Sequence, residues 1–197
     1  MSGIKFKQPY GKLEKNKKGK KCCSCLSRCC CVKLVAGIVG ALVVILGLLV
    51  GIFTLNNPIH ASCTVHWSFG ISCSYVRTKI IDQIKLWNGP AGCEKGGEKC
   101  LYKLVSNSGN TLKATHETPK AHYVDDLTFT FDTEGNTCNV QGHSTSRIWY
   151  AVLDYGTNYC NLENLITGSG LNKAKGYTEQ TSNGECTQYS SSNCDKY

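Results

Sequence analysis

Fourteen cysteines are the residues of this 197-residue chain with the most chemistry to offer, and they form two groups. Six are crowded into the ten residues CCSCLSRCCC, two residues before a long apolar run. Cysteines on the cytosolic side of a membrane helix are the usual sites of reversible S-acylation, whereas zinc sites pair Cys-x-x-Cys knuckles across an intervening fold. The spacing therefore predicts S-acylation, with unmodified thiols and a metal site as alternatives, at Cys22, Cys23, Cys25, Cys29, Cys30 and Cys31.

The other eight cysteines are dispersed after the apolar run. An even, dispersed set is typical of disulfides in a compartment outside the cytosol, and eight cysteines allow 105 pairings. We expect Cys93 with Cys100 and Cys186 with Cys194 as local loops, and Cys138 with Cys160 as a link from sheet to helix. The disulfide candidates are Cys63, Cys73, Cys93, Cys100, Cys138, Cys160, Cys186 and Cys194.

Motifs of catalysis are not found in the sequence. The five histidines form no His-Glu-x-x-His pattern, and no Gly-x-Ser-x-Gly elbow occurs. Asp125 and Asp126 are adjacent, so on a strand they point to opposite faces. One of the two is therefore expected to be exposed. His116 and His122 lie near Asp125 in sequence, and we interpret these three as solvated loop residues rather than a catalytic group. The sequence predicts no catalytic residue, cofactor or metal site, and a binding protein more than an enzyme.

Residues 34–55 form the apolar run that separates the two groups of cysteines and places them relative to a membrane. This run of 22 residues has no charged side chain and carries Thr54 as its polar group. As a helix it measures roughly 33 Å, which matches a hydrocarbon core of about 30 Å. A cleaved signal peptide is the alternative, but it would have a shorter apolar core, and Ile59-His60-Ala61 is a poor cleavage site. We expect an uncleaved signal-anchor.

The excess positive charge lies entirely before this run. Residues 1–33 contain ten Lys and Arg and one Glu, whereas the remaining chain contains 12 basic and 13 acidic residues. The positive-inside rule then places the N-terminus in the cytosol and the C-terminal part outside the cell or in a lumen, with the plasma membrane preferred. The basic head is expected to contact anionic lipid at the cytosolic face. The C-terminal part lacks the excess of basic residues that nucleic-acid binding requires.

Small residues follow one stripe of the apolar run. Gly40, Gly47 and Gly51 share a helical face, and Gly47 and Gly51 form a Gly-x-x-x-Gly spacing that lets two helices approach closely. The stripe predicts homodimerisation through this face. The alternative is that glycine is simply frequent in membrane helices.

Hydrophobic periodicity outlines the domain that follows. Strict alternation of apolar and polar residues predicts a strand over 62–75, with a hairpin that turns near Gly70 as the alternative. A hydrophobic period near 3.6 predicts a helix over 76–87. Further strands are expected at 101–105, 111–116, 126–131, 138–141 and 146–153, with a short helix at 161–166. This order of one helix and a meander resembles that of cystatin-like folds, although the Gln-x-Val-x-Gly loop of cystatins is not found.

Together these patterns predict an α+β protein: a single transmembrane helix followed by a disulfide-stapled domain with one main helix packed on an antiparallel sheet. Its parts are the head (1–33), the span (34–55), a linker (56–61), the domain (62–166) and an irregular tail stapled to it (167–197).

The expected function is a single-pass type II membrane protein that presents an extracellular binding or interaction domain to another protein. Alternating aromatic residues that line a cavity would instead favour an apolar ligand such as a lipid, with ordinary core residues as the simpler interpretation. A membrane-anchored hydrolase with a dispersed site is the third alternative. The aromatic residues concerned are Trp67, Phe69, Phe129, Phe131 and Trp149.

Overall fold

The computed structural model of the chain describes residues 23–56, 58–94 and 96–197. Contacts divide the chain into an N-terminal unit and a C-terminal unit, and each is described separately below. The acylation candidate Cys22 lies outside the described residues, as do the side chains of Cys23, Cys25, Cys29, Cys30 and Cys31. S-acylation of the head therefore stays a prediction.

Helix α1 (Cys23–Asn56) contains the apolar run. Among the described residues it is the one helix long and apolar enough to cross a membrane, with Val32–Ile52 as the span, and a signal sequence would meet the same criteria. The chain therefore has one apolar N-terminal helix that could serve as an anchor. Gly40, Gly47 and Gly51 all lie within this helix, and their packing against a second copy stays a prediction.

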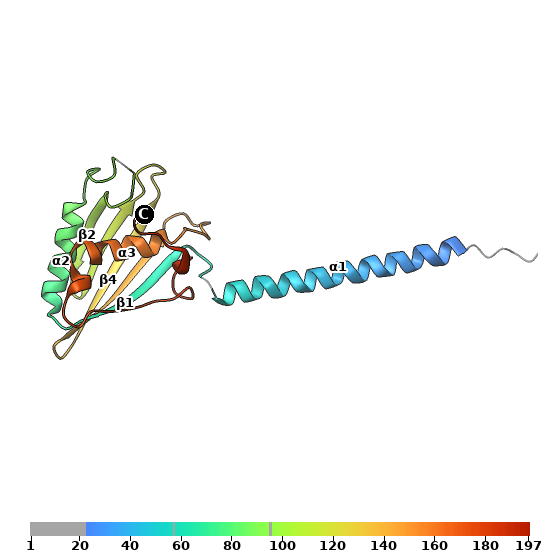
Figure 1. Cartoon of the computed structure of the whole chain (residues 1–197), viewed down its shortest axis with the longest axis horizontal. Coiled ribbons are helices and arrows are strands. Elements are labelled where there is room, and N and C mark those ends of the chain that lie inside the picture. Colours follow the sequence, from blue (N-terminus) through green and yellow to red (C-terminus); the bar gives the residue numbers. More distant parts are fainter. Residues whose placement is uncertain (1–22, 57, 95) are drawn as a thin grey trace, which may run out of the picture. The chain divides into compact units, whose positions relative to one another are not determined.

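The C-terminal unit is built on one antiparallel sheet with the strand order β2-β3-β4-β5-β1-β6 (Figure 1). The meander of β2 to β5 follows from hairpin turns at Gly109 and Gly135, which adopt the left-handed backbone conformation that such turns need. The strands are β1 (Ser62–Phe69), β2 (Tyr102–Ser108), β3 (Thr111–Glu117), β4 (Val124–Glu134), β5 (Thr137–Ser146) and β6 (Thr178–Gln180).

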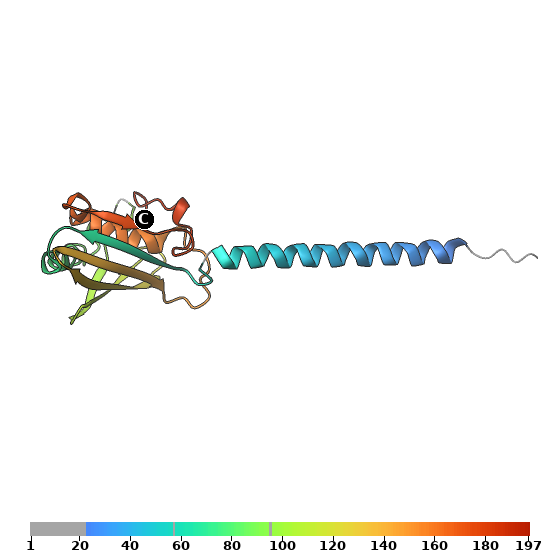
Figure 2. The same cartoon turned by 90° about the horizontal axis from the view of Figure 1, so that it is seen from below.

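Two helices, α2 (Cys73–Leu86) and α3 (Thr157–Gly168), pack on the same face of the sheet, as Figures 1 and 2 show. Alternate strand residues such as Trp67 and Phe129 point into the core between these layers, while the opposite face carries the polar alternates. The predicted α+β fold, with a helix on an antiparallel sheet and disulfides, is confirmed. Helix α3 is longer than expected and is nearly the equal of α2.

The long strand expected over 62–75 was wrong. Strand β1 ends at Phe69, where the Gly70 N–H donates to the Lys175 carbonyl, 2.7 Å away. Ser72 then caps α2, because its hydroxyl accepts a hydrogen bond from the Tyr75 N–H. The alternation beyond Phe69 is therefore coincidental, since the same residues fit a helical face once a cap is present.

The strand expected at 146–153 was also wrong. Strand β5 ends at Ser146, and the chain continues as a loop as far as α3. The segment expected to be an irregular tail instead supplies β6, which pairs with β1 at the edge of the sheet, and two short 3₁₀ helices, η1 (Leu171–Lys173) and η2 (Tyr189–Ser191).

The eight cysteines of the C-terminal unit form four disulfides. The local Cys93–Cys100 loop is as expected, whereas the pairings of Cys138 with Cys160 and of Cys186 with Cys194 were wrong. The error came from joining cysteines that are close in sequence, whereas the sheet places Cys63 of β1 directly across an isolated bridge from Cys186. The other pairs are Cys63–Cys186, Cys73–Cys138 and Cys160–Cys194.

Candidate functional site

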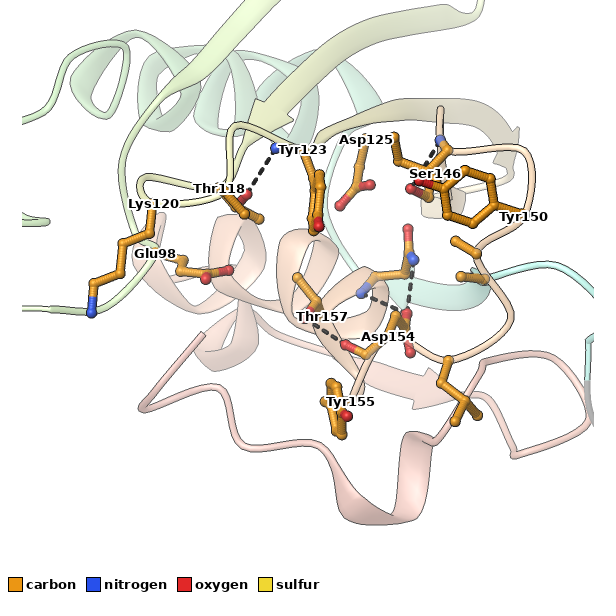
Figure 3. Close-up of a pocket in the computed structure, with 16 residues that line it drawn as sticks. Glu98, Thr118, Lys120, Tyr123, Asp125, Ser146, Tyr150, Asp154, Tyr155 and Thr157 are labelled. Atoms are coloured by element: carbon orange, nitrogen blue, oxygen red, sulfur yellow. Dashed lines mark hydrogen bonds between the residues drawn. The ribbon is translucent and has the colours of Figure 1, made fainter.

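A cavity of about 380 Å³ lies at one end of the sheet, between the β3–β4 connection, the loop after β5 and the start of α3 (Figure 3). Its size is within the range of small-ligand sites. Its walls combine an apolar and aromatic part with a polar part. The former includes Ala61, Tyr123, Ile148, Tyr150, Leu153 and Tyr155, and the latter Glu98, Thr118, Asp125, Ser146, Asp154 and Asn158.

Asp125 is the carboxyl group that β4 places at the base of this cavity. It is 4% exposed, and Asn161 Nδ2 donates to its Oδ2 across 2.7 Å. Burial raises the pKa of Asp125, although the hydrogen bond from Asn161 opposes the rise. Its neighbour Asp126 points to the opposite face, as expected, and forms a two-pronged pair with Arg147 that lowers the pKa of Asp126.

Asp154 is the second carboxyl group, and it organises the start of α3. Its Oδ1 accepts a hydrogen bond from the Gly156 N–H, and its Oδ2 accepts from the N–H and the side-chain amide of Asn158, at 3.1 and 2.7 Å. These bonds satisfy amides that the first turn of a helix leaves without partners. Burial nevertheless raises the pKa of Asp154. The carboxyl group is thus both a helix cap and a wall of the cavity.

Asparagines on one face of α3 support both carboxyl groups. Asn158, Asn161 and Asn164 are three residues apart and all buried, which places them in a row along α3, with Asn158 at the cavity wall. The Ser144 hydroxyl donates to Asn158 Oδ1 across 2.6 Å, and Tyr102 donates to the backbone oxygen of Asn161. A buried polar network of this kind holds its members in fixed positions.

Glu98 is the third carboxyl group, and its bonding is incomplete. Its Oε2 is buried and has no hydrogen-bond partner within the described part of the chain. Burial, and then the charge of Asp125, raise the pKa of Glu98. A buried polar atom without a partner is uncommon in native proteins and requires an explanation. A donor supplied by a ligand is such an explanation.

Burial raises the pKa of Glu98 and outweighs the ammonium groups of Lys196 and Lys120, which oppose the rise. Lys120 lines the cavity, but Figure 3 shows its ammonium end directed away from Asp125 and Asp154. Figure 3 also shows the rings of Tyr123, Tyr150 and Tyr155 around the space. Carboxylates attract positive charge, and aromatic faces stabilise it further. The arrangement suits a ligand that carries a cationic or hydrogen-bond-donating group on an apolar body.

The aromatic residues expected to line a ligand cavity lie elsewhere. Trp67, Phe69, Phe129 and Phe131 are all buried in the core, which is the simpler interpretation given above. Trp149 is 84% exposed on the loop after β5. The cavity is lined instead by tyrosines, whose positions depend on the course of loops.

Histidines do not complete an acid–base site. The expectation that His116 and Asp125 are solvated loop residues was wrong, because both lie on strands and are buried. His116 faces Asp125 across the β3–β4 register and packs beside Tyr102. Its Nε2 lies 2.8 Å from the Glu98 carbonyl oxygen, and burial lowers the pKa of His116 to about 4. His122 lies on the exposed turn, 2.6 Å from Glu117. No histidine is among the described residues that line the cavity. Within the described ranges, no group of three or more His, Cys, Asp or Glu could hold a metal ion.

A second cluster of acidic and aromatic side chains lies between α3, β1 and β6. Glu179 of β6 accepts hydrogen bonds from Trp67 Nε1 and from the hydroxyls of Tyr159 and Tyr177, at 2.8, 2.8 and 3.0 Å. Beside it, Glu163 of α3 has a buried Oε2 without a donor among the residues described. Burial and the neighbouring Glu179 raise the pKa of Glu163 to about 8. The three hydrogen bonds to Glu179 attach the edge strand β6 to the core.

Sequence reasoning singled out only Asp125 and Trp67 among the residues that form these two sites, and it assigned neither of them to either site. The asparagines of α3 could have been recognised, because their spacing of three within an apolar helix indicates a buried polar face. Glu98, Asp154 and the tyrosines could not, because they lie on loops whose positions are set by distant contacts.

Comparison with known proteins finds a match to part of the chain. Residues 91–168 match the family model described as a protein of unknown function, DUF1499. The match spans β2 to α3 and includes Glu98, Asp125, Asp154 and the asparagine row, but leaves out β1, α2 and β6. No curated protein and no solved structure matches the chain.

Proposed function

We propose that this chain is a single-pass type II membrane protein whose C-terminal domain, outside the cell or in a lumen, binds a small amphiphilic amine in the cavity beside α3. The observation that carries the proposal is the cavity itself, in which three carboxyl groups and three tyrosine rings surround about 380 Å³ of space. Protein partners, the first expectation above, become secondary because a preformed concave site favours a small ligand.

The anchor and the compartment rest on separate grounds. Helix α1 supplies one apolar segment of sufficient length, and ten of the 22 basic residues precede the uncharged run 34–55 within it. The four disulfides of the C-terminal unit agree with an oxidising compartment. A cytosolic domain would have its thiols reduced.

The polar part of the cavity is the reason for proposing an amine as the ligand. Burial raises the pKa of Glu98, Asp125 and Asp154, so the carboxylate forms are costly there without a counter-charge. A bound ammonium would supply that charge and would lower all three pKa values. The tyrosine rings would face the methylene or methyl groups of the cation. Binding is therefore expected to strengthen as pH rises through the range in which Asp125 ionises.

The binding test uses the full chain in lipid nanodiscs, with its disulfides intact. Benzyltrimethylammonium is the probe, and benzyl alcohol and phenylacetate are the neutral and anionic analogues of similar size, with binding measured by saturation-transfer NMR. We expect the ammonium to bind best, and Asp125→Asn to weaken its binding about tenfold through loss of a charge-assisted contact. Asp132→Asn, an exposed residue on the same strand, should change nothing.

A second variant separates ligand contact from misfolding. Tyr123 is 54% exposed, so Tyr123→Leu should leave the melting temperature unchanged while weakening the ammonium more than benzyl alcohol. Equal binding of the three probes, or an Asp125→Asn variant that melts normally and binds normally, would refute the assigned ligand class.

The topology test uses tags at the two ends of the chain in intact and permeabilised cells. A C-terminal tag that is reached from outside, with an N-terminal tag that is reached after permeabilisation, supports the type II orientation at the plasma membrane. An N-terminal tag reached from outside the intact cell contradicts it.

A further inference from the structure

Exposed apolar side chains gather on the loop after β5. In the segment 148–155, which we term the aromatic loop, Trp149 is 84% exposed and Tyr150 66%. Val152, Leu153 and Tyr155 are also exposed. Trp149 and Tyr150 pack edge to face with ring centroids 5.3 Å apart, so they form one continuous surface. Contiguous exposed apolar surface of this kind is typical of an interaction site.

Charge does not offset this apolar surface. The aromatic loop contains no Lys or Arg, and its one acidic residue is Asp154. The Asp154 carboxyl is turned toward α3, where it accepts hydrogen bonds from Gly156 and Asn158. The outward side of the loop therefore presents rings, aliphatic groups and tyrosine hydroxyls. Trp and Tyr are the residues that are enriched at the headgroup level of membrane proteins, where one end of the side chain is apolar and the other is hydrated.

The aromatic loop is fastened to the segment that follows α1. The Ala61 N–H donates to the Ala151 carbonyl across 2.8 Å, and the Ser146 N–H donates to the Ala61 carbonyl across 3.1 Å. His60 Nε2 lies 3.2 Å from the Ile148 carbonyl oxygen. Figure 1 shows the start of β1 and the loop after β5 at the same end of the sheet. These contacts hold the loop close to residues 60 and 61.

The length of the linker limits how far the loop can be from the bilayer. Helix α1 ends at Asn56 and β1 begins at Ser62, so residues 57–61 join them. Five residues in fully extended form reach at most about 17 Å. The headgroup region on each side of a bilayer is roughly 5–7 Å thick, from the difference between its total and hydrocarbon thickness. A loop held to Ala61 therefore cannot move far from the lipid surface in any orientation of the domain.

We propose that the aromatic loop inserts into the headgroup region of the bilayer that holds α1, with Trp149, Tyr150 and Leu153 as its lipid contacts. The proposal rests on the membrane anchor of the proposed function. Tyr150, Leu153 and Tyr155 also line the cavity, so its mouth opens at the lipid surface. An amphiphilic amine dissolved in the membrane would then enter the cavity from the interface and not from bulk water.

The test uses the fluorescence of Trp149 in the full chain, reconstituted into phosphatidylcholine vesicles that contain a lipid with a nitroxide on its headgroup. Both leaflets carry the nitroxide, so the orientation of insertion does not matter. The chain has three tryptophans; Trp67 is buried and Trp87 packs against the core. The Trp149 signal is the difference between the chain and Trp149→Phe. We expect the nitroxide to remove most of that signal.

Matched variants keep the readout specific. Trp87→Phe should leave the quenched fraction of the Trp149 signal unchanged. Leu153→Asp places a charge on the exposed loop and should reduce the quenching by at least half, because a charged side chain resists entry into the interface. Its melting temperature, measured in the same vesicles, reports that the fold is intact, since Leu153 is 54% exposed.

Vesicle flotation in the same samples separates the two proposals. A chain that fails to float contradicts the membrane anchor. A chain that floats while Trp149 is quenched by aqueous acrylamide and not by the nitroxide overturns the loop insertion alone. Protection from both quenchers also overturns it, because protein would then cover the loop, and dependence of that protection on protein density would identify a second copy of this chain.

Discussion

The neutral replacement Glu163→Gln should stabilise the C-terminal domain at alkaline pH. Glu163 faces Glu179, whose oxygens already accept hydrogen bonds from Trp67, Tyr159 and Tyr177, so two charged carboxylates there would repel each other. A proton on Glu163 gives its buried Oε2 a donor role toward Glu179. Burial and Glu179 accordingly raise the pKa of Glu163 from 4.5 to about 8. The side-chain amide of the introduced glutamine would donate a hydrogen bond at every pH in this range, because it does not titrate.

The sign and the size of the effect follow from proton linkage. Between pH 4.5 and 8 the folded chain holds a proton on Glu163 that the unfolded chain has lost, so the free energy of unfolding falls as pH rises. The loss of unfolding free energy is absent below pH 4.5 and complete above pH 8. The full shift would correspond to about 5 kcal/mol. Because Glu163 is only half-buried and solvent screens its charge, we expect about 2 kcal/mol, or roughly 6 °C in melting temperature.

The assay is thermal unfolding of the full chain in mild detergent, followed by tryptophan fluorescence at a series of pH values from 5 to 9. Glu163→Gln should match the wild type near pH 5 and exceed it above pH 8. Glu98, Asp125 and Asp154 contribute slopes of the same sign, so the comparison is the difference between variant and wild type. Glu134→Gln, at an exposed hairpin end, is the control. A difference that stays constant with pH would refute the linkage.

Three further outcomes test other parts of the chain. Gly142→Ala should destabilise the domain by about 2 kcal/mol in the same melting assay, because its added Cβ would lie 2.5 Å from Trp67 Cζ3, whereas Gly89→Ala, in open space, should be neutral. His116→Gln should flatten the loss of stability between pH 6.5 and 4, since burial lowers the pKa of His116 to about 4 and the unfolded chain therefore takes up the proton first. Hydroxylamine-sensitive acyl labelling should disappear when the six head cysteines become serine, and persistent labelling would exclude them as the sites.

Local patterns identified most of the elements of the domain. Helix α2 and strands β2 to β5 were predicted because a period near 3.6 or 2 records which side of an element is buried. The same reasoning failed at 70–75, where alternation continued past Phe69 into a capped helix, and at 147–153, where aromatic residues that resemble a strand are exposed. Hydrophobic periodicity predicts secondary structure only if apolar residues are buried. The prediction therefore fails where an apolar residue is exposed or where a cysteine forms a disulfide.

Long-range contacts decided the disulfides and the cavity. Cys63 and Cys186 are 123 residues apart, and only the pairing of β1 with both β5 and the returning tail brings them together. In the same way, Glu98 and Asp154 come from two loops and Asp125 from the start of β4, and all three meet at one end of the sheet. Nothing in the spacing of three isolated carboxyl groups indicates that they share a desolvated space.

The sequence by itself determined that the chain has one apolar segment of membrane-spanning length, that its excess of positive charge precedes the uncharged run 34–55, and that its cysteines form two groups. These properties depend on composition along the chain alone. The tertiary structure alone decided which cysteines pair, which carboxyl groups are buried together and which aromatic residues face outward. Burial and pKa depend on what surrounds a group in space, and for loops those surroundings are supplied by residues far away in the sequence.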